Sequence, residues 1–247
     1  MDYDEYCDEL EVEGARFVAL CSRANESAMV PSCPEWSVTQ LLAHVGFVHR
    51  WARHLVDVRA RERISARDMN LSRGPVSPAW ISEGVADVLS TLRASDPHDV
   101  MWAWGADQHV AFWARRLLHE TLVHRVDLEQ SLGAASEIDQ LIAVDGIDEF
   151  LANLERAGDF SPNVKNLVGS GEIITFRVDE GAAWSVRLLS HGFEFIEAGA
   201  DADAVLSGPA SQILLVLYRR LSLEESSCVL NGDADLAETW LANIALL

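Results

Sequence analysis

A helical stripe in the middle of the chain carries two polar side chains where an apolar face is expected. Between about residues 109 and 132, apolar residues recur at spacings of three and four, which predicts an amphipathic α-helix. Its inward stripe consists of Trp113, Leu117, Glu120, His124 and Leu128. Residues four apart point in nearly the same direction on a helix, so Glu120 and His124 share one face. A carboxylate inside a helical domain needs a compensating partner, and a bound metal ion is one such partner.

A second polar interruption occurs upstream, in a helical segment predicted over residues 37–62. Its inward stripe consists of Leu41, His44, Val48, Trp51 and Leu55. At helical spacing His49 and His54 point away from this stripe, so His44 is the candidate ligand. Two facing helices would then supply three ligands in total. A catalytic zinc site uses three protein ligands and keeps its fourth position open.

Structural alternatives remain open for the same residues. A histidine on an apolar stripe is often a hydrogen-bonded core residue, and Glu120 has Arg116 and Arg125 nearby as ion-pair partners. His44, Glu120 and His124 would then satisfy one another within a bundle that binds no metal. A metalloprotease is excluded, because the two histidines around Glu120 are five residues apart instead of the four of the zincin motif.

The acidic residue one helical turn beyond His124 also has two interpretations. Asp127 is either a hydrogen-bond partner that orients this histidine or a surface acid.

The charge of the chain restricts its partners. The 247 residues include 19 Lys and Arg against 39 Asp and Glu, giving a net charge of −20, which argues against nucleic acids and anionic membranes as partners.

The four cysteines are scattered without a CxxC pair, as expected for free thiols in a reducing compartment. The acidic start lacks the features of a signal peptide, and no apolar run is long enough to span a bilayer. We therefore expect a cytoplasmic monomer or small homo-oligomer.

The periodicity changes along the chain and predicts two domains. Helices are expected at about residues 4–25, 37–62, 79–94 and 109–132, with Ser37 as an N-cap, a turn over residues 30–36 and a structured loop over 95–108. After a bridging helix at about 138–156, alternation with period two predicts strands around Phe176, Val186, Phe193 and Val205, followed by helices at about 209–221 and 233–245. The predicted fold class is α plus α+β, with a four-helix bundle in residues 1–135 and a small α+β domain in residues 136–247.

Two longer runs add a family resemblance to this interpretation. The first begins at Pro31 with Pro-Ser-Cys-Pro-Glu-Trp-Ser-Val and continues to Arg50 through Leu-Leu-Ala-His-Val-Gly. The second extends from Phe112 to Asp127 and reads FWARRLLHETLVHRVD. Both runs, in this order, resemble the signatures of the mycothiol-dependent maleylpyruvate isomerase family. The resemblance covers nearly the whole chain and implies a DinB-like four-helix metal-binding domain, followed by a small C-terminal domain related to sterol-carrier-like folds.

The resemblance also implies cofactors and a reaction. A divalent metal, usually zinc, would be held by His44, Glu120 and His124. Mycothiol, the thiol of actinobacteria, would be the cosubstrate, with its sulfur at the open metal position and deprotonated by the ion's charge. The thiolate would add to the activated double bond of a small electrophile similar to maleylpyruvate. Rotation and loss of the thiol would give the trans isomer, whereas a thiol transferase would stop after addition or displacement.

One segment departs from the family pattern. The family's C-terminal domain usually has Trp-Gly-Arg where this chain has Tyr218, Arg219 and Arg220. The resemblance implies that Arg220 is the catalytic arginine, which would hold substrate carboxylates as a bidentate pair. A solvated helix end, where cations are favourable, explains Arg219 and Arg220 equally well. A non-catalytic metal- or ligand-binding module is therefore the alternative to a mycothiol-dependent isomerase or S-transferase.

Overall fold

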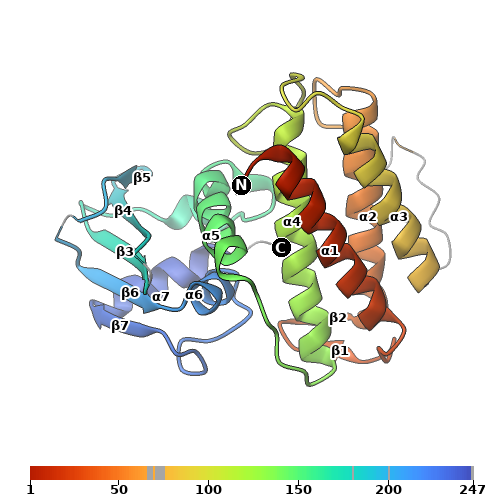
Figure 1. Cartoon of the computed structure of the whole chain (residues 1–247). Helices are drawn as coiled ribbons and strands as arrows, with labels where there is room; N and C mark the ends of the chain where they lie inside the picture. The colour runs from red at the N-terminus through yellow and green to blue at the C-terminus, as the bar shows by residue number, and fades with distance from the viewer. Residues whose placement is uncertain (66–68, 70–75, 180, 200, 246–247) are drawn as a thin grey trace. The chain divides into compact units, whose positions relative to one another are not determined.

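The protein consists of two compact units, which are described separately. The computed structural model describes all residues except 66–68, 70–75, 180, 200, 246 and 247 (Figure 1). The units are Met1–Ser136 and Glu137–Leu247. We propose that they correspond to the two domains, 1–135 and 136–247, expected from the sequence.

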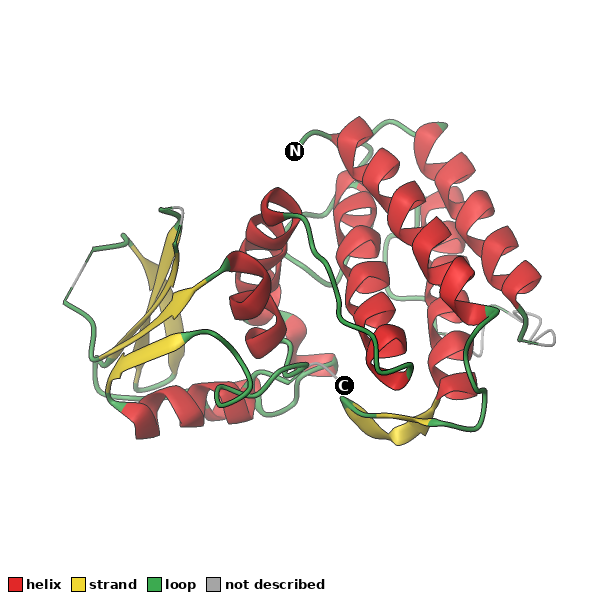
Figure 2. Ribbon diagram, turned by 60° about the horizontal axis from the view of Figure 1, so that its bottom comes forward, coloured by secondary structure: helices red, strands yellow, loops and turns green. Residues whose placement is uncertain are grey.

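Long helices make up most of the first unit. They are α1 (Tyr3–Cys21), α2 (Val38–Asp57), α3 (Pro78–Arg93) and α4 (Val110–Ser131). These helices lie side by side (Figure 2). The helices α1 and α4 pack together, as do α2 and α3, and α2 also contacts α4. Ser37 caps α2 by accepting from the Gln40 N–H, and the Gln40 side chain accepts from the Ser37 N–H, which confirms the predicted capping box.

The helix α2 ends five residues earlier than the sequence predicts. Arg59 has a φ of 49°, in the left-handed region, and its N–H donates to the carbonyl of Val56 at 3.2 Å. The next N–H, that of Ala60, donates to the carbonyl of Leu55 at 3.0 Å. These two bonds form a Schellman motif, which stops the helix by satisfying its last carbonyls.

The segment predicted as a turn over residues 30–36 is a short antiparallel hairpin. Its strands are β1 (Met29–Val30) and β2 (Cys33–Ser37), and it contacts both α2 and α4. The prediction missed the strands because Pro31 and Pro34 interrupt any alternating pattern. The hairpin brings Ser32 and Trp36 into the vicinity of α4.

An aromatic cluster connects α2, α4 and the loop between α3 and α4. Trp51 on α2 and Trp113 on α4 pack edge to face, with ring centroids 5.3 Å apart. Trp102 of the loop lies 5.9 Å from Trp51 and 6.1 Å from Trp113. The loop is ordered as predicted, because the Gln108 side chain donates to the carbonyls of Ala103 and Gly105.

The second unit confirms the predicted change from helices to a sheet. Its elements are α5 (Gln140–Leu154), β3 (Ile173–Val178), β4 (Ala183–Leu189), β5 (Gly192–Ile196), β6 (Ala204–Gly208), α6 (Ala210–Leu217), β7 (Val229–Gly232) and α7 (Ala234–Asn243), with short 3₁₀ turns at Ala157–Asp159 and Val164–Asn166. The strand order is β5-β4-β3-β6-β7, in which β3 and β6 are parallel and the other neighbours are antiparallel (Figure 1). The core includes Phe176, which packs against Trp240 of α7, and the half-buried Phe193 also contacts the Trp240 ring.

The strand β7 was not predicted, because it is short and largely exposed and has no alternating burial. Within the described part of the chain, no helix combines the length and hydrophobicity needed to cross a membrane.

The end of α6 differs from the prediction and places an arginine in an unusual conformation. The helix stops at Leu217 instead of about residue 221. Arg219 has a φ of 58° and donates its N–H to the Val216 carbonyl at 3.0 Å, and the Arg220 N–H donates to the Leu215 carbonyl at 2.8 Å. Arg219 is thus the left-handed residue of a Schellman motif, a position that favours glycine.

Replacing Arg219 by glycine is expected to stabilise the protein by about 0.5–1 kcal/mol, measured as the urea midpoint of unfolding. A left-handed non-glycine residue costs roughly 1–2 kcal/mol, and the greater chain entropy of glycine offsets part of this gain. Arg219→Ala is the matched control, because it also loses the bond from the guanidinium to the Leu241 carbonyl but keeps a β-carbon. A glycine variant no more stable than the alanine variant would contradict this explanation.

Candidate metal centre

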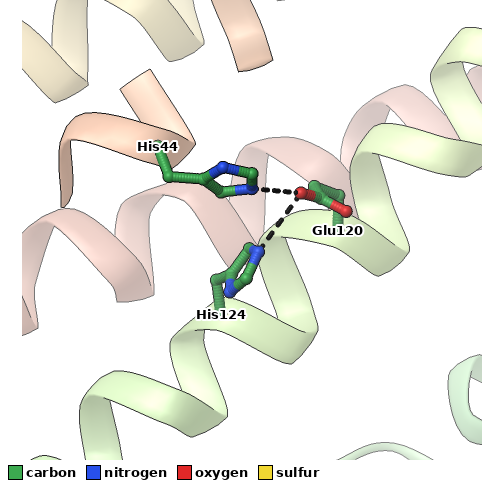
Figure 3. Close-up of side chains that lie close together, drawn as sticks. All are labelled: His44, Glu120 and His124. Atoms are coloured by element: carbon green, nitrogen blue, oxygen red, sulfur yellow. Dashed lines mark hydrogen bonds and ion pairs between the residues drawn. The ribbon is translucent and has the colours of Figure 1, made fainter. Parts of the chain in front are cut away.

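Three side chains of the first unit converge at the interface between α2 and α4. His44 comes from α2, whereas Glu120 and His124 come from consecutive turns of α4 (Figure 3). The Glu120 Oε1 atom lies 2.9 Å from the His44 Nε2 atom and 3.2 Å from the His124 Nε2 atom. One potential ligand atom from each residue lies within 4.8 Å of the others. The structure therefore brings together the three residues that the sequence predicts as ligands.

The three side chains are only partly covered. Their exposed fractions are 31% for His44, 21% for Glu120 and 9% for His124. The exposure of His44 and Glu120 leaves the group accessible from solvent, whereas His124 lies at its inner side. A structural site is normally closed, and a site that reacts with small molecules needs this kind of access.

A buried carboxylate fixes the orientation of the His124 ring. Its Nδ1 atom lies 2.8 Å from the Oδ2 atom of Asp127, which is completely buried. The other Asp127 oxygen accepts from the Ser32 hydroxyl of the hairpin at 2.5 Å. Of the two interpretations of Asp127, the orienting partner is therefore correct and the surface acid is wrong. A carboxylate on one ring nitrogen leaves the other, Nε2, to act as a ligand.

The Arg116 guanidinium donates a hydrogen bond to the second carboxylate oxygen of Glu120. Its Nη2 atom lies 3.2 Å from Glu120 Oε2, so this oxygen is held away from the two histidines. The pairing with Arg116 considered from the sequence thus occurs together with the histidine contacts and does not replace them. The guanidinium of Arg125, the other partner considered from the sequence, binds Glu13 and Glu129.

The electrostatics of the group favour an ionised carboxylate. Burial alone would raise the pKa of Glu120, but the charge of His124, hydrogen bonds from His124 and His44 and the charge of Arg116 hold it well below its usual range. Burial alone would lower the pKa of His124, but the charge of Glu120 and hydrogen bonds to Asp127 and Glu120 raise it to about 9. Without a metal, the charge of Glu120 is thus balanced by Arg116 and by a proton on His124.

The hairpin also covers the two histidines with an aromatic ring. The Trp36 ring lies 4.9 Å from the His44 ring and 6.2 Å from the His124 ring, nearly parallel to the latter. Neither Trp36 nor Ser32 was predicted from the sequence as a residue of the site. Their only signal was their presence in the run that begins at Pro31, which the family signature includes.

His49 lies off the stripe that contains His44, as predicted, and it is nevertheless completely buried. Its Nε2 atom lies 2.9 Å from the Thr121 Oγ1 atom on α4. Burial lowers its pKa to about 4, more than the opposing charge of Glu120 raises it, so the ring is uncharged at neutral pH. The helix α2 packs against both α3 and α4, which buries a face wider than one stripe. His54 is only half-buried.

Arg220, the predicted catalytic residue, belongs to the second unit. It is half-buried just beyond the end of α6, and its Nη1 atom donates to the Tyr218 carbonyl at 2.8 Å. Its catalytic role stays a prediction.

The donor set of the first unit fits a divalent metal ion. Two imidazole nitrogens and one carboxylate oxygen form a ligand set of known catalytic zinc sites. The donors face one another, His124 has the required orientation, and the carboxylate is ionised. The hydrogen bonds among these atoms are also those of the metal-free alternative, so the geometry alone is compatible with both.

Comparisons with known proteins agree with the resemblance seen in the sequence. Residues 7–129 match the family model of the mycothiol maleylpyruvate isomerase N-terminal domain, and residues 142–239 match that of the MDMPI C-terminal domain. A crystal structure of the mycothiol-dependent maleylpyruvate isomerase is similar in fold, with a TM-score of 0.62 and 15% identity over 95% of each chain. A histidine-to-alanine mutant of that isomerase gives a TM-score of 0.60 and 14% identity over 92% of this chain and 93% of that one. A comparison with curated protein sequences finds no match.

Proposed function

Because the chain belongs to the mycothiol maleylpyruvate isomerase family, we propose that it is a metal- and mycothiol-dependent enzyme acting on a small electrophile. His44, Glu120 and His124 bind the metal, and zinc suits this donor set best. The observation that carries the proposal is the convergence of three donor atoms while Asp127 holds the rear nitrogen of His124. The Asp127 carboxylate supports the proposal because it directs the Nε2 atom of His124 toward the centre.

The residues around the centre have distinct tasks in this proposal. A bound divalent ion supplies the positive charge that keeps a thiol deprotonated at neutral pH. Asp127 keeps Nε2 of His124 directed at the centre, and Arg116 restricts Glu120 to one donor oxygen. The partial exposure of His44 and Glu120 gives a small thiol access. The Trp36 ring shields the two imidazoles on one side.

The reaction class follows from thiol chemistry. Addition of the thiolate to an activated cis double bond, rotation about the resulting single bond and loss of the thiol give the trans isomer. A reaction that stops after addition or displacement is an S-transfer. We propose isomerisation of a maleylpyruvate-like substrate or S-transfer to a related electrophile, with Arg220 binding a substrate carboxylate.

Replacing Arg220 by methionine is expected to lower kcat/KM for a carboxylate substrate by about 100-fold without changing metal content. Two hydrogen bonds to a charged group contribute roughly 1.5 kcal/mol each, and about 1.4 kcal/mol corresponds to tenfold. Steady-state kinetics with mycothiol and maleylpyruvate measure the effect. Arg187→Met is the control, because Arg187 is another arginine of this unit and pairs with Glu194 on the surface. An Arg220→Met variant with wild-type kcat/KM would show that Arg220 does not bind the substrate carboxylate.

The proposed activity is tested by metal content and turnover in one preparation. Elemental mass spectrometry of the untagged protein should find near-stoichiometric zinc, and the same protein should isomerise maleylpyruvate or consume a related electrophile only with mycothiol. Turnover that is unaffected by removing the metal would contradict the proposal.

Zinc binding is expected to release about one proton per ion at pH 7. The pKa of His124 is raised to about 9, so its ring is protonated below that pH and must lose the proton to become a ligand. Zinc affinity should therefore rise with pH, by about tenfold per unit, and level off above pH 9. Calorimetry in two buffers of different ionisation enthalpy measures the number of protons released per zinc ion. Asp127→Asn removes one cause of the raised pKa and should reduce the release, whereas proton-independent binding in the wild type would contradict the assignment of His124.

A non-catalytic metal- or ligand-binding module of the same fold is the second candidate. The observation that favours it is the departure of Tyr218 and Arg219 from the family's Trp-Gly pattern. Such a module would bind zinc through the same three residues but would not respond to a thiol. Adding mycothiol to the metal-loaded protein distinguishes the two candidate functions, because only the enzyme should respond to the thiol.

A further inference from the structure

A second hydrogen bond joins α2 to α4 beneath the candidate centre. The His49 Nε2 atom on α2 lies 2.9 Å from the Thr121 Oγ1 atom on α4. Both residues are completely buried, in contrast to the partly exposed pair of His44 and Glu120. Thr121 directly follows Glu120, and His49 lies five residues after His44. The two pairs therefore connect the same stretches of α2 and α4 at two depths.

The direction of the deeper hydrogen bond follows from its surroundings. The other ring nitrogen of His49, Nδ1, is buried and has no hydrogen-bond partner among the described residues. An uncharged imidazole carries one proton, and a buried N–H without an acceptor is costly. The proton therefore sits on Nε2 and is donated to the Thr121 hydroxyl oxygen. This is a specific, completely buried polar contact between the two helices.

The interface must hold its register for the centre to bind a metal. The helix α2 supplies one ligand and α4 supplies two, so a shift of one helix along the other changes the distances from His44 to both Glu120 and His124. Functional sites need their geometry held within about 0.5 Å by supporting residues. The contact between His44 and Glu120 cannot provide this support, because both residues turn their donor atoms to the metal when it binds. The contact between His49 and Thr121 uses no ligand atom, so metal binding does not require it to break.

We propose that His49 and Thr121 form a positioning clamp that sets the register of α2 on α4 and thereby the geometry of the metal centre. This inference rests on the proposed function, because it requires that the centre binds a metal. It assigns no chemical step to either residue.

The test removes both partners together. In the double variant His49→Leu/Thr121→Val no buried polar atom is left without a partner, so the fold should persist with a similar urea midpoint. We expect zinc affinity to fall by about 10- to 100-fold, the range found for residues that orient metal ligands, and the absorption spectrum of the Co²⁺-substituted protein to change. Thr121→Ser keeps the hydroxyl and should retain wild-type affinity, whereas Thr121→Val alone should not.

A matched pair in the second unit controls for general loss of a buried hydrogen bond. Thr175 and Ser185 are buried, with hydroxyl oxygens 2.8 Å apart, so Thr175→Val/Ser185→Ala should leave zinc affinity unchanged. A folded His49→Leu/Thr121→Val variant with wild-type affinity and Co²⁺ spectrum would overturn the clamp. Equal affinities of Thr121→Val and Thr121→Ser would do so as well. A wild-type protein that binds no zinc would overturn the proposed function and the clamp together.

Discussion

Replacing Glu120 by glutamine is expected to lower zinc affinity by two to three orders of magnitude while the protein stays folded. A four-ligand zinc site contributes roughly 10–16 kcal/mol, so one ligand corresponds to roughly 3–4 kcal/mol, or about 100- to 1,000-fold in affinity. The amide keeps the size of the side chain and an oxygen that faces the two histidines, but it loses the negative charge. Competition with a chelating zinc indicator measures the affinity.

An exposed glutamate provides the control for this substitution. Glu35→Gln on the hairpin makes the same change in net charge on the surface of the same unit and should leave zinc affinity unaltered. Zinc binding of wild-type strength in Glu120→Gln would mean that the three converging residues are a structural cluster.

Replacing Arg125 by methionine is expected to destabilise the first unit by about 3–5 kcal/mol, measured by urea denaturation. The Arg125 guanidinium binds Glu13 of α1 at 2.5 Å and Glu129 at 2.7 Å, and both Arg125 and Glu13 are almost completely buried. Without Arg125 the carboxylate of Glu13 stays buried, and its remaining cationic partner among the described residues is the exposed Arg16. Removing one member of a buried ion pair typically costs this amount, because the remaining charge is uncompensated.

Two further variants separate this explanation from a general effect of losing arginine. Glu13→Leu/Arg125→Met removes both charges and should recover most of the lost stability, since apolar replacement of a buried pair is often nearly neutral. Arg93→Met breaks an exposed pair that also reaches α1, through Asp8 and Glu11, and should cost less than about 1 kcal/mol. A small loss of stability in Arg125→Met would show that water, and not Arg125, compensates the buried negative charge of Glu13.

The sequence was most informative where one periodic pattern controls both the fold and the site. The spacing of three and four around Glu120 and His124 fixes the helix and places both side chains on one face. The same reasoning placed His44 on a facing helix, and the structure brings the three together. The alternation around Phe176 and Val186 likewise predicted β3 and β4 correctly. Local periodicity suffices in these cases because each element buries one defined face.

The parts that the sequence did not predict depend on contacts between distant segments. Ser32 bonds to Asp127, 95 residues away, and His49 bonds to Thr121, 72 residues away, and no local pattern encodes such pairs. The burial of His49 was not predicted, because it depends on the packing of α2 against two neighbouring helices. The ends of α2 and α6 depend on Arg59 and Arg219 in left-handed conformations, which arginine seldom adopts.

Titration of the Co²⁺-substituted protein with mycothiol tests the central claim most directly. We predict that Co²⁺ binds with the intense visible absorption of a low-coordinate site and that mycothiol adds a sulfur-to-metal charge-transfer band. Both signals should be lost in Glu120→Gln and retained in Glu35→Gln. A folded protein that takes up no Co²⁺ would contradict the metal centre, and a Co²⁺ spectrum that mycothiol leaves unchanged would contradict thiol activation at this centre.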